Sequence, residues 1–293
     1  MANFRSNLKY FPIWILTLLP LRVLYMFSDI FYLFIYYVIR YRRKVVFNNL
    51  RKSFPEKSEQ ELVRTAKKFY RHFCDSFIEG IYAYNISEKE IEKRFVYKNP
   101  ELLNELYAKG KSVILIAGHY GNWEWPIGLM LWSNYILMGI YRPLSSRYFD
   151  KLFIKIRSKF GGVPVTIKQT LRVLMQYAAE KKLTVTYFLS DQRPGMESIH
   201  YWTTFLNQET PIITGVEKVA RKLKQAVVFF EVQNVKRGYY ETEFTLLSED
   251  ASLTKEFEIT ELHTRKLEKI IINKPEYWLW SHKRWKFRKE DYQ

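Results

Sequence analysis

Short apolar runs alternate with longer amphipathic stretches through the middle of the chain. The apolar runs cover residues 112–117, 135–141, 184–189 and 226–232. The stretches between them, with apolar residues at helical spacing, cover roughly residues 123–132, 146–160, 170–181 and 214–224. Short runs of this kind are typical of buried parallel strands, and their alternation with helices predicts βαβ units with right-handed crossovers. We therefore expect an α/β fold with a mixed, largely parallel sheet flanked by helices.

Additional elements are predicted on both sides of this core. Residues 45–108 have the pattern of helices, and Ser58 with Glu61 has the spacing of a capping box, as does Ser87 with Glu90. A strand is expected over 239–247, where a turn at Arg237-Gly238 would pair it with the preceding strand and make the sheet mixed. A closing helix is expected over 254–273.

An apolar segment, Tyr10–Ile39, precedes the predicted domain and contains only two formally charged residues, Arg22 and Asp29. About 20 mostly apolar residues cross a bilayer, so the segment is long enough, although prolines and polar residues interrupt it. We expect an N-terminal membrane-anchoring helix that is either tilted across the bilayer or partly in its interface. A buried aromatic helical hairpin in a soluble protein is the alternative.

A basic cluster follows the apolar segment at Arg40, Arg42, Arg43 and Lys44, and predicts that the chain beyond it stays in the cytoplasm. We expect two units: residues 1–44 as anchor and basic flank, and 45–293 as the main domain. The single cysteine, Cys74, excludes an internal disulfide framework.

Charge and aromatic content restrict the class of partner. The chain has 47 Lys and Arg against 30 Asp and Glu, a formal net charge of +17, and 17% aromatic residues. This composition favours an anionic partner, which leaves nucleic acid and an acidic membrane surface as alternatives. Residues 278–289 interleave Trp and Phe with Lys and Arg. With an anchor at the other end, we interpret this run as an edge that lies beside anionic headgroups, although stacking on RNA bases or a packed terminus would also fit.

One histidine lies where a ligand site is expected. The run 112–117 leads into Gly118-His119 and, five residues after the histidine, Glu124. Ligands of open α/β sheets bind beyond the carboxyl ends of strands. With His119 in the turn after the strand and Glu124 in the next helical turn, the carboxylate would hold one ring nitrogen while the other takes a proton from an alcohol. A structural histidine beside a carboxylate is the alternative.

Several other chemistries lack their usual motifs. The chain has no G-x-S-x-G elbow, P-loop or G-x-G-x-x-G pattern, which removes the common serine-hydrolase, NTPase and dinucleotide-binding classes. The other histidines, at 72, 200, 263 and 282, have no metal-ligand spacing. We expect neither a metal nor another cofactor.

Residues 118–124 (GHYGNWE) resemble the H-x4-D/E motif of glycerolipid acyltransferases, in the form found in the late, secondary lipid A acyltransferases of Gram-negative bacteria. The similarity continues in order along nearly the whole chain, in the blocks at 42–55, 141–143, 160–162, 191–195, 210–215 and 277–286. The resemblance is specific because so many blocks match in the right order.

The resemblance implies a reaction and a set of site residues. The donor would be a thioester of acyl carrier protein or coenzyme A, and the acceptor a hydroxyl of a lipid A precursor on the cytoplasmic face of the inner membrane. Carried over by position, His119 is the general base and Glu124 its partner. Substrate-binding roles are implied for Arg142, which would steady phosphate or oxyanion charge, and for Asp191, Gln192 and Arg157.

Two blocks depart from the family pattern. Residues 190–193 read Ser-Asp-Gln-Arg, and the 210–214 block is also variant, so the acceptor is less constrained than the reaction. An ornithine-type aminolipid or another membrane lipid remains an alternative acceptor. Two alternative functions also remain: a membrane-tethered nucleic-acid-binding protein, and a lipid hydrolase that uses water in place of an acceptor.

Overall fold

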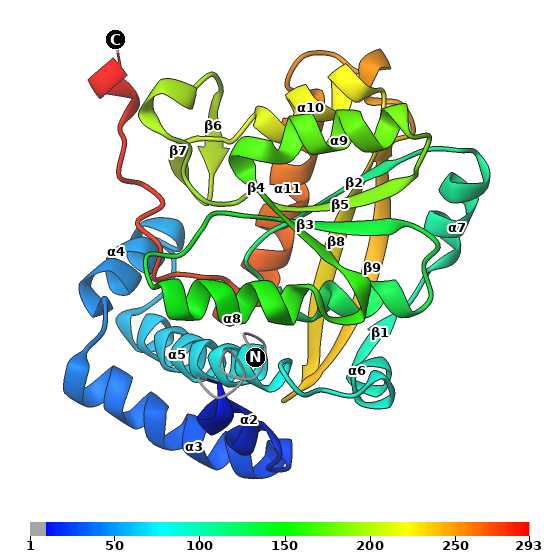
Figure 1. The fold of residues 1–293 in the computed structure, drawn as a ribbon. Coiled ribbons are helices and arrows are strands. Elements are labelled where there is room, and N and C mark those ends of the chain that lie inside the picture. The colour runs from blue at the N-terminus through cyan, green and yellow to red at the C-terminus, as the bar shows by residue number, and fades with distance from the viewer. Residues whose placement is uncertain (1–9, 293) are drawn as a thin grey trace.

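A seven-stranded sheet forms the centre of the computed structural model, which describes residues 10–292 (Figure 1). The strand order is β1-β9-β8-β2-β5-β3-β4, and every neighbouring pair is parallel except β8 and β9. The strands are β1 Phe95–Tyr97, β2 Val113–Ala117, β3 Ile136–Tyr141, β4 Val163–Thr166, β5 Thr184–Leu189, β8 Ala226–Lys236 and β9 Tyr239–Ser248. The predicted mixed, largely parallel α/β fold is confirmed.

Some elements differ from the sequence-based prediction. The short strands β1 and β4 were not predicted, and neither was a separate hairpin of β6 Trp202–Phe205 and β7 Gln208–Pro211. Strands of three or four residues are too short to establish an apolar pattern. The helix expected over 123–132 is a 3₁₀-helix, η2 Trp125–Leu131, whose first turn contains Pro126. The predicted β8–β9 turn at Arg237-Gly238 is confirmed.

Helices cover both faces of the sheet, with α9, α10 and α11 on one side and α5 and α8 on the other (Figure 1). Alternate residues of β2 belong to different cores: Val113 and Leu115 pack in the core that includes α8, and Ile114 and Ile116 in the core that includes α10 and α11. The bounds are α5 Glu59–Tyr82, α8 Arg147–Arg157, α9 Thr170–Ala179, α10 Gly215–Leu223 and α11 Glu258–Asn273.

Three further helices, α4 Arg43–Ser53, α6 Glu88–Arg94 and α7 Glu101–Ala108, lie with α5 in the segment predicted to be helical. The capping box at Ser58 and Glu61 is present at the start of α5, and the Ser87 hydroxyl accepts the backbone N–H of Glu90 at the start of α6. These caps satisfy backbone N–H groups that a helix start leaves unpaired, and they explain where both helices begin.

The apolar N-terminal segment folds as helices. Helix α2, Phe11–Thr17, is followed at Pro20 by α3, Leu21–Leu33, which continues as a π-helix, η1 Phe34–Ile39. By length and composition, Leu21–Ile39 is one helix that could cross a membrane, with a mean hydropathy of 1.4 over its most apolar window. The predicted apolar helix is therefore present, and it packs along α5.

Candidate active site

His119 and Asp191 lie side by side because two neighbouring parallel strands end in register. Ala117 of β2 pairs with Leu189 of β5, and each site residue follows two positions later. The His119 ring Nδ1 is 2.6 Å from Oδ1 of Asp191, and the His119 backbone N–H donates to Oδ2 at 2.8 Å. The carboxylate therefore fixes both the position of the residue and the orientation of its ring.

The buried Asp191 carboxylate is stabilised in its charged form. Burial by itself raises its pKa, but the His119 ring, the His119 backbone N–H and the indole N–H of Trp278 at 2.8 Å outweigh burial and lower the pKa to about 2. The ionised Asp191 carboxylate accepts a hydrogen bond from the protonated Nδ1 of His119, so the free lone pair of the ring lies on Nε2. The amide nitrogen of Gln192 lies 3.3 Å from this Nε2. The second ring nitrogen is thus available to a neighbouring donor.

Glu124 does not hold the imidazole, contrary to the prediction. Its two carboxylate oxygens accept hydrogen bonds from Arg157, at 2.7 and 3.1 Å. The loop turns at Gly121, whose φ of +62° suits glycine, and the Asn122 side chain then accepts the backbone N–H groups of Glu124 and Trp125. This turn directs Glu124 toward α8. Asp191 occupies the position beside the His119 ring that was predicted for Glu124.

Arg157 and Glu124 border a narrow apolar cavity of about 50 Å³. Both side chains are largely buried, at 24% and 12% exposure, and the Arg157 guanidinium also lies 5.7 Å from the centroid of the Tyr141 ring. Apolar and aromatic side chains form most of the remaining wall: Trp123, Pro126, Ile127, Leu137, Ile140, Tyr187 and Leu189. Trp123 also contacts the His119 ring edge-on, with centroids 5.4 Å apart. The wall of an apolar cavity thus reaches the imidazole.

Arg142 stands apart from the other predicted site residues. It follows the end of β3 and is exposed, and within residues 10–292 it forms no hydrogen bond or ion pair. His119, Asp191 and Gln192 form one cluster and Glu124 with Arg157 a second, joined by the short loop from 119 to 124.

A family model for bacterial lipid A biosynthesis acyltransferases matches residues 5–287. The chain belongs to this family. It is 26% identical to a lipid A biosynthesis acyltransferase of Haemophilus influenzae over 79% of this chain and 72% of that protein. It is 24% identical to the lipid A biosynthesis lauroyltransferase of Escherichia coli over 95% and 90% of the two chains. A palmitoleoyltransferase of the same organism is 21% identical over 85% and 80%. The protein is an acyltransferase of lipid A biosynthesis, with an acyl donor and a lipid acceptor.

The C-terminal segment packs against the loop of residues 118–124, and its predicted role as an exposed headgroup edge is wrong for three of its residues. Trp278, Trp280 and Arg284 have exposed fractions of 2%, 0% and 1%. The backbone N–H of Leu279 donates to the His119 carbonyl at 3.1 Å, so the segment pairs with the motif loop itself. Sequence reasoning missed the role of Trp278. Closely spaced tryptophans were a signal for burial, but adjacent lysines and arginines obscured it.

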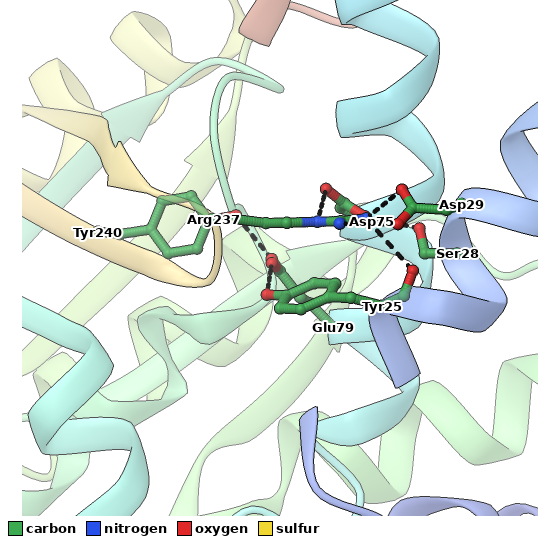
Figure 2. Close-up of polar contacts among 7 residues, drawn as sticks. All are labelled: Tyr25, Ser28, Asp29, Asp75, Glu79, Arg237 and Tyr240. Carbon is green, nitrogen blue, oxygen red and sulfur yellow. Dashed lines mark hydrogen bonds and ion pairs between the residues drawn. The ribbon is translucent and has the colours of Figure 1, made fainter. Parts of the chain in front are cut away.

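A buried carboxylate, Glu79 of α5, is hydrogen-bonded to the loop of residues 118–124 through Asn122. It accepts hydrogen bonds from Asn122 at 2.7 Å and from the hydroxyls of Tyr25 and Tyr240, each at 2.6 Å. Burial raises the pKa of Glu79 to about 7, despite these donors. Figure 2 shows Glu79 between Tyr25 and Tyr240. Because Asn122 caps the turn that carries Glu124, Glu79 links the N-terminal helix to the active-site loop.

Proposed function

We propose that this acyltransferase moves a fatty acyl chain from a thioester of acyl carrier protein or coenzyme A to a hydroxyl of a lipid A precursor, on the cytoplasmic face of the inner membrane. His119 is the general base, and Asp191 orients it. The observation that carries the proposal is the pairing of a buried, ionised Asp191 with Nδ1 of His119, which leaves Nε2 as the proton acceptor.

The reaction needs one proton to move from the acceptor hydroxyl to His119, and then from His119 to the leaving thiolate. Nε2 of His119 takes the proton of the acceptor hydroxyl while its oxygen attacks the thioester carbonyl carbon. The tetrahedral intermediate collapses with cleavage of the carbon–sulfur bond, and the imidazolium returns the proton to the leaving thiolate. Asp191 stabilises the imidazolium formed between these steps. The products are an ester and a free thiol, so the reaction balances without another reactant.

Gln192 lies where the acceptor hydroxyl would approach. Its amide nitrogen contacts Nε2 in the present arrangement. On substrate binding the hydroxyl takes this place, and the amide is positioned to contact the acceptor oxygen or the carbonyl oxygen instead. Gln192 is therefore assigned a substrate-binding role.

In this proposal, the ion pair of Glu124 and Arg157 binds the thioester end of the acyl group. Both residues line the apolar cavity, and Trp123 of the same wall contacts the His119 ring. Arg157 can then stabilise the negative charge that develops on the carbonyl oxygen, and Glu124 positions it. The cavity volume is far below that of a fatty acyl chain, so wall side chains must move when the chain enters. The exposed Arg142 suits a phosphate of the donor or of the headgroup.

The test is mass spectrometry of membrane lipids from a Gram-negative host that lacks its own late acyltransferases. Expression of the wild-type chain should add the mass of one acyl group to lipid A, and His119→Ala or Asp191→Asn should not. His200→Ala is the matched control, because His200 is exposed. An acyl group gained by an aminolipid, and not by lipid A, would contradict the proposal that the acceptor is a lipid A precursor. Free fatty acid released in vitro without an acceptor would identify a hydrolase.

A further inference from the structure

Helix α3 is attached to the globular domain along its whole length. Its buried residues recur at helical spacing and form one stripe: Leu21, Leu24, Tyr25, Ser28, Tyr32, and in η1 Ile35 and Tyr36. The stripe runs antiparallel to α5. Tyr25 donates to Glu79, and the Ser28 hydroxyl donates to Asp75, each at 2.6 Å. Nearer the other end, the Tyr36 and Tyr70 rings are 5.2 Å apart.

Helix α5, against which α3 packs, cannot enter a bilayer. Charged residues occur along all of α5: Glu59, Glu61, Arg64, Lys67, Lys68, Arg71, Asp75 and Glu79. Charged side chains are strongly disfavoured in hydrocarbon, where irregular or charged surfaces must be covered by protein. A bilayer-spanning α3 would either carry α5 with it or lose every contact with α5. Both outcomes conflict with the packing seen here.

The acidic residue in the middle of α3 is also bound to the domain. Arg237, in the turn between β8 and β9, contacts Asp29 at 2.7 and 3.0 Å and Asp75 at 2.6 and 2.8 Å. Figure 2 shows this guanidinium between the two carboxylates. Three elements distant in sequence therefore meet at one cation, and a helix free to cross the membrane would place Asp29 in hydrocarbon without this partner.

The opposite stripe of α3 and η1 is apolar and exposed. Met26, Ile30 and Val38 have exposed fractions of 65%, 64% and 65%. Other exposed apolar side chains of the same segment and of α2 extend this surface: Phe27, Leu33, Phe34, Tyr37, Ile39, Phe11, Trp14, Ile15, Leu18 and Leu19. Exposed apolar surface of this extent marks an interaction site, not a solvent-facing surface.

We propose that α2, α3 and η1 lie flat in one leaflet of an anionic membrane, with this apolar stripe inserted among the acyl chains, and that none of them crosses the bilayer. A helix that is apolar on one side and held by protein on the other fits the interface. The basic residues Arg40 and Lys44 follow the stripe and are exposed, which favours anionic headgroups as the partner.

The inserted surface continues toward the active-site edge of the sheet. The Tyr10 ring, just before α2, lies 4.9 Å from the ring of Tyr148 at the start of α8, and Leu144 and Phe149 beside it are exposed. This part of α8 follows the end of β3, on the same edge as His119. Insertion of α2 therefore brings the mouth of the site to headgroup level, where a lipid acceptor can enter without leaving the bilayer.

Membrane topology gives the first test. Arg22→Cys and Lys44→Cys, each in a Cys74→Ala background, flank the helix and are labelled in sealed inner-membrane vesicles with a membrane-impermeant maleimide. Both cysteines should react from the same side, since both ends of an interfacial helix face the domain's compartment. Reaction from opposite sides would establish a span and overturn the proposal. Labelling after detergent solubilisation controls for intrinsic reactivity. No acyl transfer is involved, so the outcome is independent of the proposed function.

Vesicle binding gives the second test. The full-length protein should partition onto phosphatidylcholine vesicles containing phosphatidylglycerol more strongly than onto phosphatidylcholine alone, and added salt should remove the difference. Ile30→Ser with Phe34→Ser should weaken binding at least about tenfold. The matched control is Leu253→Ser with Ile272→Ser, because both are exposed apolar residues elsewhere. Unchanged binding by the stripe variant would contradict the proposal, as would a dimer, formed without vesicles, that this variant abolishes.

Discussion

The Asp191 carboxylate holds His119 at two points, with Oδ1 at the ring Nδ1 and Oδ2 at the backbone N–H. The strand register brings the two residues together, and the Trp278 indole completes the shell around the carboxylate. This arrangement assigns the orientation of the imidazole to a residue 72 positions away in sequence. It also separates that task from Glu124, which is paired with Arg157.

Asp191→Asn should lower kcat by at least about 10²-fold and leave KM for the acyl donor nearly unchanged, because the imidazolium loses its charged partner while the donor contacts stay. Steady-state kinetics with purified protein and acyl donor measures both constants. A variant that keeps wild-type kcat would remove Asp191 from the mechanism. Glu56→Gln, at an exposed carboxylate in the loop before α5, is the matched control and should behave as wild type.

Glu124→Gln should reduce activity by a route independent of His119. The Arg157 guanidinium would lose its ionic partner in a largely buried position, which costs about 1.5–3 kcal/mol in hydrogen bonding to a charged group. Since Glu124 and Asp191 share no partner, the effects of Glu124→Gln and Asp191→Asn on log kcat should add. Strong non-additivity in the double variant would indicate that both carboxylates act on the same ring after all.

Glu79 predicts a pH dependence of stability. Its folded pKa of about 7 lies above its ordinary value of 4.5, so the folded protein binds this proton more tightly than the unfolded chain. The resulting stabilisation is complete below pH 4.5 and is lost as the pH rises through about 7. The Glu79→Gln variant lacks this contribution to the pH dependence of stability, because glutamine does not titrate. Chemical denaturation from pH 5 to pH 8 should show wild type losing stability relative to the variant. Parallel curves would contradict the prediction.

Trp278→Phe should weaken the support of Asp191. The indole N–H donates to a buried carboxylate at 2.8 Å, and loss of such a bond costs about 1.5–3 kcal/mol. We expect a lower unfolding free energy and reduced kcat. Trp285→Phe is the matched control, since its indole bonds Thr210 and not the carboxylate. Equal effects of both substitutions on kcat would show that the loss is general and not transmitted through Asp191.

Much of the architecture was predictable because buried parallel strands and the helices between them have distinct patterns. The position of His119 at the end of β2 followed from the same reasoning. Its partner did not, since a spacing of five residues drew attention to Glu124, whereas the turn at Gly121 and the cap by Asn122 send that side chain elsewhere. The equal offsets of His119 and Asp191 from paired strands become visible only once β2 and β5 are known to be neighbours.

The N-terminal and C-terminal segments show a second limit of sequence reasoning. Both mix aromatic, apolar and charged residues. A membrane role was expected for the first from its length and apolar composition, and for the second because an anchor was expected at the other end of the chain. The tertiary contacts separate them, because Trp278 and Trp280 are enclosed by the domain while one stripe of α3 stays exposed. Which side of an aromatic segment is covered depends on residues far away in sequence, such as Arg237 beside Asp29.

The most direct test is a transfer assay with purified His119→Ala, acyl donor and lipid A precursor, together with a measurement of its unfolding free energy. A positioned general base contributes about 10²–10⁴ in rate, so transfer should fall by this factor or more while the variant remains folded and binds the donor. Transfer at the wild-type rate by a folded His119→Ala protein would contradict the assignment of the base.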